Sequence, residues 1–568
     1  MSTGLLHADG RAISPREIGN ARRTANIAPP KPRASLAQGP TGGGFNPYAY
    51  DGAVPFSPDM PAWYPALRSA DNEINFDRMR LAARARDLVR NDGWAKGAIN
   101  RILAAVVGAD FFPIPKPNHR ALARRFGAKF DATWALEYTS AIRAEYHIHA
   151  NDPRFFADAT RTQTLTQMFR TALWHKLVDG DSVAMSMWDT ARVEQGANYA
   201  TCLQLIEPER LCNPQWAIDT EFRRGGVQVD GLQAPVGYHI QRGHSFDWFS
   251  PIKSITWDYH PRETEYGRPV MIHDFERVMA RQHRGVGILT AALARLQKMN
   301  RYDDASLMAA LLRATMGLFI ISGRDEEEIA DSMNPTQIGA DGLPVEGSDF
   351  FGAWNYYKAT AANTLGGVRI PMMAPGDNIK SVSGSGQTDD YEAINKVGHR
   401  YLAAVTGQGT PEVSNDFSEL NYSSYRGELM QAWRVTKMRR YDFAHGTCTP
   451  FYVGFGEEVL AKFPELLPRG LTYVDIAENR SALFDVDWYG PGMGWTDPVK
   501  ERQGEVLGLD AAFGSLEDTC ATVEGVFWRD RLEQRAMELA EMNRLGLKQP
   551  DWAGEQPASA VDKKPQAA

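Results

Sequence analysis

The stretch NDFSELNYSSYRGEL, residues 415–429, lies where a polar loop gives way to a long helix. The loop, TGQGTPEVSNDFSELNY over residues 406–422, is rich in the Gly, Pro, Ser and Asn residues that favour turns. A long helix is predicted after it, over 423–447, and another helix before it, over about 388–405. The stretch therefore places a turn-rich polar segment between two helices.

Length and composition are those of a folded protein with several domains. The chain has 568 residues and 63.2 kDa, and 43% of its residues are hydrophobic. Its net charge of −8 argues against a protein that grips nucleic acid tightly. Its four cysteines form no C-x-x-C pair, which disfavours a zinc ribbon or a disulfide framework. There is neither a signal-peptide pattern nor an apolar run near the roughly 20 residues that span a bilayer, so we expect a soluble protein that does not enter a membrane.

The rest of the sequence predicts an α+β fold. Helices are expected over about 75–106, with a break at Asn91–Gly93, and over 119–148 and 160–178, followed by short strands such as SVAMSMW and PVGYHIQ. A helix over 287–316 would be about 45 Å long. It has apolar positions near both ends and charges between them, which suggests that it crosses an exposed waist. These positions are Leu289, Leu293, Leu296, Leu307 and Leu311.

Four short motifs invite a catalytic or binding interpretation. His147 and His149 could ligate one metal ion if they shared a strand face, but no other cluster supports them. Gly384–Gly386 lacks the nucleophile-elbow spacing, and the acids of Asp325–Glu328 are typical of a solvated surface. GPGMG, residues 490–494, is not followed by the lysine of a nucleotide loop. We therefore predict no metal, no cofactor and no enzymatic activity.

Residues 415–429 resemble the signature of lambda-type phage portal proteins, the head–tail connectors. That signature has Asp-Phe-Ser and then Asn-Tyr-Ser-Ser-x-Arg at the start of a long helix. Other segments are similar to the family in the same order, namely LQLIEPERL, GVQVDGLQAPVGYHI, RGVGILTAAL, APGDNIK and WTDPVKERQ, where Asp497 and Pro498 would begin a helix. The resemblance covers roughly 74–545. The matching signature residues are Asp416, Phe417, Ser418, Asn421, Tyr422, Ser423, Ser424 and Arg426.

The resemblance implies a portal fold with a mixed wing domain, a two-helix stem, a small β-containing clip, a tunnel loop and an α-helical crown. Composition adds a mobile arm and a flexible tail. The expected boundaries are arm 1–70, first part of the wing 71–285, stem helix 286–318, clip 319–386, second stem helix 387–405, tunnel loop 406–422, long helix and second part of the wing 423–496, crown 497–548 and tail 549–568.

The implied function is a ring, usually a dodecamer, at one vertex of the virion capsid. Double-stranded DNA would pass through it in packaging and ejection without sequence recognition. The implied partners are the terminase large subunit, the head-completion protein, and the major capsid and scaffold proteins, with assembly in the host bacterial cytoplasm. Stem-interface candidates are the five leucines above, and channel candidates are Gln408, Thr410, Glu412, Ser414, Asn415, Lys396 and Arg400.

Two other classes of protein compete with this interpretation. One is a phage capsid-shell or tail-tube protein, which would assemble as a lattice or a stacked tube. The other is a DNA-processing enzyme, which would need an acidic metal cluster or a Walker lysine. The sequence has no G-x-x-x-x-G-K-[ST] motif, which disfavours the enzyme.

Overall fold

The computed structural model describes residue 63 and residues 65–245, 252–316, 364–365, 368–369, 387–418, 421–494 and 497–547. The predicted tail lies wholly outside the described residues, and so does nearly all of the predicted arm. The predicted clip also lies outside them, apart from the paired strands β9 (Thr364–Leu365) and β10 (Val368–Arg369). Met1–Leu67 form one unit and Arg68–Ala568 a second, which contains all the described helices and strands.

The second unit begins with three helices, α2 (Ala70–Ile74), α3 (Arg78–Asn91) and α4 (Gly93–Val106). The predicted break at Asn91–Gly93 is confirmed. Asp92 has extended backbone angles, and its side chain accepts a hydrogen bond from the Ala95 N–H at 2.9 Å. That bond satisfies a free donor at the helix start and fixes the direction of α4.

Three further helices cover residues 119–178. They are α5 (His119–Phe126), α6 (Ala132–Ala150) and α7 (Leu165–Val178). Each begins at a residue whose side chain accepts from the first helical turn, namely Asn118, Asp131 and Thr164. Short polar side chains at these positions explain why the helices start where they do.

The strands form antiparallel sheets. One has the order β3-β2-β8, with β2 (Asp181–Trp188) between β3 (Thr201–Ile206) and β8 (Met271–Phe275). The short helix α8 (Thr190–Glu194) connects β2 to β3. A second sheet has the order β4-β5-β6-β7 and contains β4 (Arg223–Arg224), β5 (Val227–Val229), β6 (Pro235–Gln241) and β7 (Trp257–Pro261). Antiparallel sheets packed with separate helices make this an α+β fold, as predicted.

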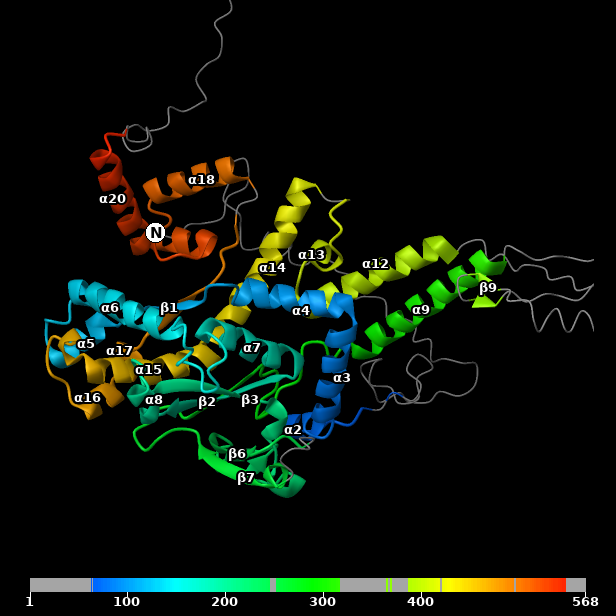
Figure 1. Cartoon of the computed structure of the whole chain (residues 1–568), viewed down its shortest axis with the longest axis horizontal. Helices are drawn as coiled ribbons and strands as arrows, with labels where there is room; N and C mark the ends of the chain where they lie inside the picture. The colour runs from blue at the N-terminus through cyan, green and yellow to red at the C-terminus, as the bar shows by residue number, and fades with distance from the viewer. Residues whose placement is uncertain are drawn as a thin grey trace, which may run out of the picture. The chain divides into compact units, whose positions relative to one another are not determined.

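The C-terminal half is mostly helical (Figure 1). Helix α9 (Leu293–Met316) runs beside α12 (Gln387–Thr406), and the short α13 (Thr410–Ser414) follows α12. Helix α14 (Tyr422–Phe443) continues through a π-helical turn, Ala444–Cys448, into α15 (Thr449–Lys462). The long helix predicted to end at residue 447 therefore continues to Lys462.

Small helices and the last strand complete the C-terminal half. Helices α16 (Tyr473–Glu478) and α17 (Arg480–Leu483) lead to β11 (Val486–Tyr489), which pairs with β1 (Phe112–Pro115). The remaining helices are α18 (Pro498–Asp510), α19 (Leu516–Thr519) and α20 (Trp528–Arg544).

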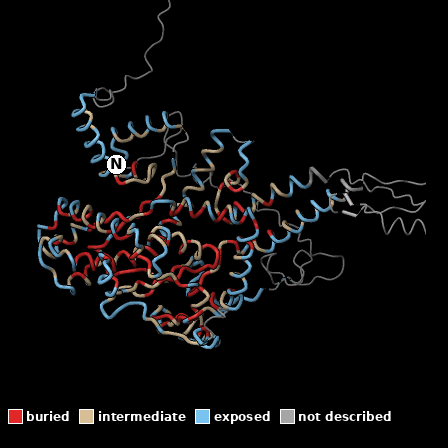
Figure 2. The backbone as a smooth tube through the Cα atoms, in the orientation of Figure 1, coloured by how far each residue is buried: buried red, intermediate tan, exposed pale blue. Residues whose placement is uncertain are grey.

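The main hydrophobic core lies where α4, α6, α7 and α15 meet β11 (Figure 2). Its largest buried side chains include Tyr138, Phe169, Phe451 and Phe455. Leu289, Leu402 and Val413 belong to the same core, so the segments around α9, α12 and α13 are attached to it. By contrast, α18 and α20 contain no residue that is buried.

The segment Gln282–Leu289 connects the strands to α9 through the interior. Arg284 is fully buried and donates to the Asp181 carboxylate and to the backbone carbonyls of Pro208, Leu211 and Gly225. Burial opposes a charge on Asp181, but Arg284 and neighbouring donors hold the pKa of Asp181 well below its ordinary value. A Cβ atom at Gly287 would lie 2.1 Å from the Val178 carbonyl oxygen, so only glycine fits there.

Candidate functional site

The signature stretch forms the start of α14. The Asn421 side chain accepts from the Ser424 N–H at 2.8 Å and from the Ser424 hydroxyl at 2.7 Å. Asn421 is therefore the N-cap, and it satisfies the backbone N–H of Ser424 in the first turn of α14. Asp416, another signature residue, accepts from the N–H and hydroxyl of Ser418 at 3.0 and 2.6 Å. These bonds lower the pKa of Asp416.

The first half of the predicted tunnel loop packs into the protein. Gly407, with φ of +66°, follows the last residue of α12, and the Gln408 N–H donates back to the Ala403 carbonyl at 3.1 Å. The Gln408 side-chain amide donates to the Ala98 carbonyl of α4 at 2.9 Å. Pro411 and Val413 are buried. The sequence presents 406–422 as a polar, turn-rich segment, but its first half is anchored, because Val413 fills a place in the core.

The second half of the loop is exposed. Residues 415–418 are all exposed, while 419–420 lie outside the described residues. Asn415 has a left-handed φ of 55°, and its side chain accepts from Arg101 of α4. The Phe417 ring meets the Tyr425 ring edge-to-face, with their centroids 5.8 Å apart. This exposed half of the loop therefore offers polar atoms to an outside partner.

A groove of about 710 Å³ gathers several of the predicted channel residues. Lys396 and Arg400 of α12 line it together with Thr410, Ser414 and Asp416. Its charge is mixed, because Glu428 also lines it and Glu392 pairs with Lys396 at 3.0 Å on the same helix. Of the remaining candidates, Gln408, Glu412 and Asn415 do not line this groove. The Glu412 carboxylate instead accepts from the Gly409 N–H at 3.3 Å.

The two predicted stem helices pack against each other. The Tyr302 ring of α9 stacks on the Tyr391 ring of α12 at 5.9 Å, and the Tyr401 hydroxyl donates to the Ala291 carbonyl at 3.0 Å. Gly398 lets Met299 approach so closely that a Cβ atom there would lie 1.8 Å from the methionine methyl. The pair is therefore interlocked toward the start of α9 and the end of α12.

The five stem leucines divide into two groups. Leu289 and Leu296 are 0% and 3% exposed and belong to the main core, and Leu293 is half-buried against it. Leu307 and Leu311, farther along α9, are 63% and 46% exposed. The helix also begins at Leu293 and not at residue 286, because Gly285 and Gly287 keep the preceding segment inside the core. Leu289 and Leu296 are thus covered by their own chain.

Asp497 and Pro498 begin α18, as predicted. The Asp497 side chain accepts from the Lys500 N–H at 3.4 Å, and Pro498 occupies the first helical position. The preceding GPGMG lies between β11 and α18, and its Met493 N–H donates to the Thr522 carbonyl at 3.1 Å. Arg426 of the signature pairs with Glu501, which joins α14 to α18. Nothing in the sequence indicated that pair.

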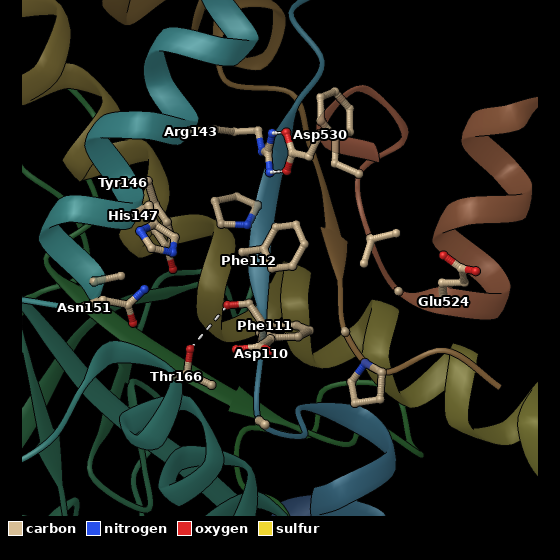
Figure 3. Close-up of a pocket in the computed structure, with 18 of the residues that line it drawn as sticks. Asp110, Phe111, Phe112, Arg143, Tyr146, His147, Asn151, Thr166, Glu524 and Asp530 are labelled. Atoms are coloured by element: carbon tan, nitrogen blue, oxygen red, sulfur yellow. Dashed lines mark hydrogen bonds and ion pairs between the residues drawn. The ribbon is translucent and has the colours of Figure 1, made fainter. Parts of the chain in front are cut away.

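A second tie holds the C-terminal helices to the body. Arg143 of α6 donates to both carboxylate oxygens of Asp530 on α20, at 2.8 and 2.6 Å (Figure 3). Its guanidinium also lies 4.4 Å from the Phe527 ring centroid. These residues line a groove of about 720 Å³ that includes Asp110, Asn151 and Thr166.

The metal hypothesis for His147 and His149 assumed a strand, and the structure places both on α6. His147 is exposed, whereas His149 is buried and stacks on Phe455 at 5.2 Å. Burial lowers the pKa of His149 to about 4. Among the described residues there is no cluster of three or more His, Cys, Asp or Glu suited to a metal ion. None of the described helices is both long enough and apolar enough to cross a membrane.

Comparison with known proteins gives a consistent family. The family described as phage portal protein, lambda family, matches residues 56–440, well over half of the chain. The portal protein of Escherichia phage N15 is 26% identical over 506 residues, covering 89% of this chain and 92% of the relative. Portal protein B of Escherichia phage lambda is 27% identical over 512 residues, covering 89% and 91%. The probable portal protein of Halomonas phage phiHAP-1 is 22% identical over 491 residues, covering 85% and 84%.

Solved structures show a weaker likeness. A chain from the neck of an empty gene transfer agent particle, computed with C6 symmetry, is 15% identical with a TM-score of 0.37, covering 78% of this chain and 92% of the other. A chain from the native neck, computed with C12 symmetry, is 12% identical with a TM-score of 0.33 and the same coverage. On the family match, which spans α9, α12, α13 and most of α14, the chain belongs to the lambda family of phage portal proteins, which are structural proteins and not enzymes.

Proposed function

We propose that this portal protein forms a closed ring, of twelve copies as is usual in the family, at one vertex of the capsid. Double-stranded DNA passes through the ring during packaging and ejection. The terminase large subunit and later the head-completion protein dock on the clip, residues 319–386, and capsid and scaffold proteins contact the wing. Assembly takes place in the host bacterial cytoplasm, and the ring stays in the virion.

The observation that carries this proposal is the unequal burial along the stem. Besides Leu307, Met308 of α9 is 59% exposed, and Ile394 and Val397 of α12 are 41% and 48% exposed. Apolar side chains gathered on two paired helices are typical of a surface that meets a partner. Identical copies that meet head-to-tail close into a ring when the rotation between them fits.

The DNA-facing part of the proposal rests on residues 415–418 and the adjoining groove. Polar side chains such as Asn415 and Ser418 contact phosphates without reading sequence. Thr410, Ser414, Lys396 and Arg400 line the groove beside them, where acids offset the two cations. A net charge of −8 over the chain is consistent with DNA that slides, since tight binding needs many neutralised phosphates.

The first experiment tests assembly with Leu307→Asp. A charge on an interface leucine prevents burial of that surface, so we expect a folded protein that forms few or no rings by negative-stain microscopy. Ala305→Asp is the matched control, because two residues turn the helix by about 200° and place the same charge on the other side. Rings as abundant in Leu307→Asp as in wild type would overturn the stem interface. DNA cleavage or ATP hydrolysis that copurified with wild-type rings would overturn the structural role.

The second experiment tests the loop with residues 415–418 replaced by Gly-Ser-Gly-Ser. Pro411 and Val413 are left in place, so the core contact of the loop is kept. We expect normal rings and proheads that package or retain less DNA. Wild-type DNA retention in this variant would show that the exposed loop does not handle DNA.

A further inference from the structure

His283 lies in the segment that leads into α9, and both of its ring nitrogens face hydrogen-bond acceptors. Nδ1 is 2.8 Å from a carboxylate oxygen of Asp71, and Nε2 is 2.9 Å from the backbone carbonyl oxygen of Gln233. The His283 backbone N–H donates to the other Asp71 oxygen at 3.0 Å. His283 and Asp71 are buried, with 3% and 4% of their surfaces exposed.

Hydrogen-bond chemistry decides the protonation of this ring. A carbonyl oxygen and an ionised carboxylate only accept, and a neutral imidazole has one N–H. Only the imidazolium, with two N–H groups, can donate to both partners. We propose that His283 is an imidazolium in the folded protein and that its second proton acts as a pH-sensitive latch, which holds α2 against the segment entering α9.

The charged groups around His283 come from several elements. Asp71 of α2 faces the ring, Arg224 of β4 opposes its charge, and the neighbouring Arg284 turns toward Asp181. Burial alone would lower the pKa of His283, but the bonds to Asp71 and to the Gln233 carbonyl raise it. His273, also buried, has the opposite shift: burial lowers its pKa despite a 3.2 Å contact between Nε2 and Asp181.

Loss of the second proton to solvent leaves a nitrogen lone pair facing an acceptor, so one of the two contacts breaks. Because the pKa of His283 is raised on folding, the latch is fully formed below about pH 6.5 and is lost as pH rises through the folded pKa. Three contacts in this region do not depend on that proton: the His283 backbone N–H to Asp71 at 3.0 Å, Asn75 to Asp219 at 2.7 Å and Arg78 to Asp181 at 3.5 Å. The latch therefore acts on α2, the first helix after Met1–Leu67.

The direct test uses wild-type protein and deuterium exchange at the imidazole C2 position, which reports a titration midpoint for each histidine by mass spectrometry. We expect a midpoint above about 6.5 for His283 and below it for His273. A His283 midpoint at or below 6.5 would overturn the proposal.

The second test compares backbone-amide exchange over residues 73–81 in wild type, His283→Gln and the exposed control His147→Gln. In wild type and the control we expect exchange, corrected for intrinsic rates, to speed up roughly tenfold as pH rises from 6 to 9. His283→Gln should be fast at every pH, since glutamine has no proton to lose in this range. A pH-independent wild type, or a variant that keeps the wild-type pH response, would contradict the latch.

Discussion

The two ends of the α9 region differ in how far their apolar side chains are buried. Near the start, Leu289 and Leu296 lie within the main core of their own chain. Farther along, Leu307 and Met308 are 63% and 59% exposed. Both ends carry leucines four residues apart, Leu289 and Leu293 at one end and Leu307 and Leu311 at the other, so an apolar stripe does not by itself identify an interface. What differs is whether the same chain already covers the side chain.

The largest expected effect is on the free energy of unfolding, when a leucine at each end is truncated to alanine. Leu289→Ala should lower the free energy of unfolding by about 2–5 kcal/mol, because a core leucine loses its contacts and leaves a cavity. Leu307→Ala should change it by less than about 0.5 kcal/mol in unassembled protein, because the side chain is exposed. Chemical denaturation of the two variants below the assembly concentration measures both. Equal losses would remove the distinction between the two ends.

Acid should destabilise the folded protein by protonating a buried histidine, His149 of α6. His149 has a folded pKa of about 4 and an unfolded pKa near 6.5, so the unfolded chain binds more protons between these values. Stability should fall as pH drops through this window, by up to about 3 kcal/mol in total. His149→Phe keeps an aromatic ring beside Phe455 and should flatten the slope, whereas His147→Gln, on the exposed side of α6, should not. An unchanged slope in His149→Phe would place the acid sensitivity elsewhere.

The smallest effect concerns the C-terminal helices. Like the exposed end of α9, α18 and α20 contain no buried residue. Arg143→Ala removes both bonds to Asp530 and the contact with Phe527, which should raise amide exchange in α20 roughly tenfold without unfolding the core. Arg544→Ala is the control, because Arg544 pairs with Glu541 on the same helix. Unchanged exchange in Arg143→Ala would mean that other contacts hold α20.

Local signals in the sequence predicted those element boundaries that neighbouring side chains determine. The break at Asp92 and the start at Asp497 depend on neighbouring side chains alone, and the structure bears them out. The start of the long helix was predicted at residue 423, and α14 begins at Tyr422. The α+β class followed from the same kind of reasoning, since a run of helix patterns, a run of strand patterns and further helix patterns follow one another along the chain.

The predictions that were wrong concerned features that depend on residues far away in the sequence. Val413 looked like part of a polar loop because its core partners lie elsewhere in the chain. The start of α9 was placed too early because the fit of Gly287 against Val178 is a tertiary contact. His147 and His149 suggested one site only while a strand was assumed, since a helix turns them to different faces. The pairs Arg426–Glu501 and Arg143–Asp530 join residues with no sequence pattern in common.

The π-helical turn at Ala444–Cys448 has a consequence for how this helix can change over evolution. A π turn holds one more residue than an α turn, and each α-helical residue advances the chain by about 100° around the axis. Gain or loss of that residue would rotate all of α14, with Tyr422 and Arg426 at its far end, while α15 kept its nine buried residues in register. The turn thus separates two features that can change independently: the buried side chains of α15, and the rotational orientation of the helix that carries the signature.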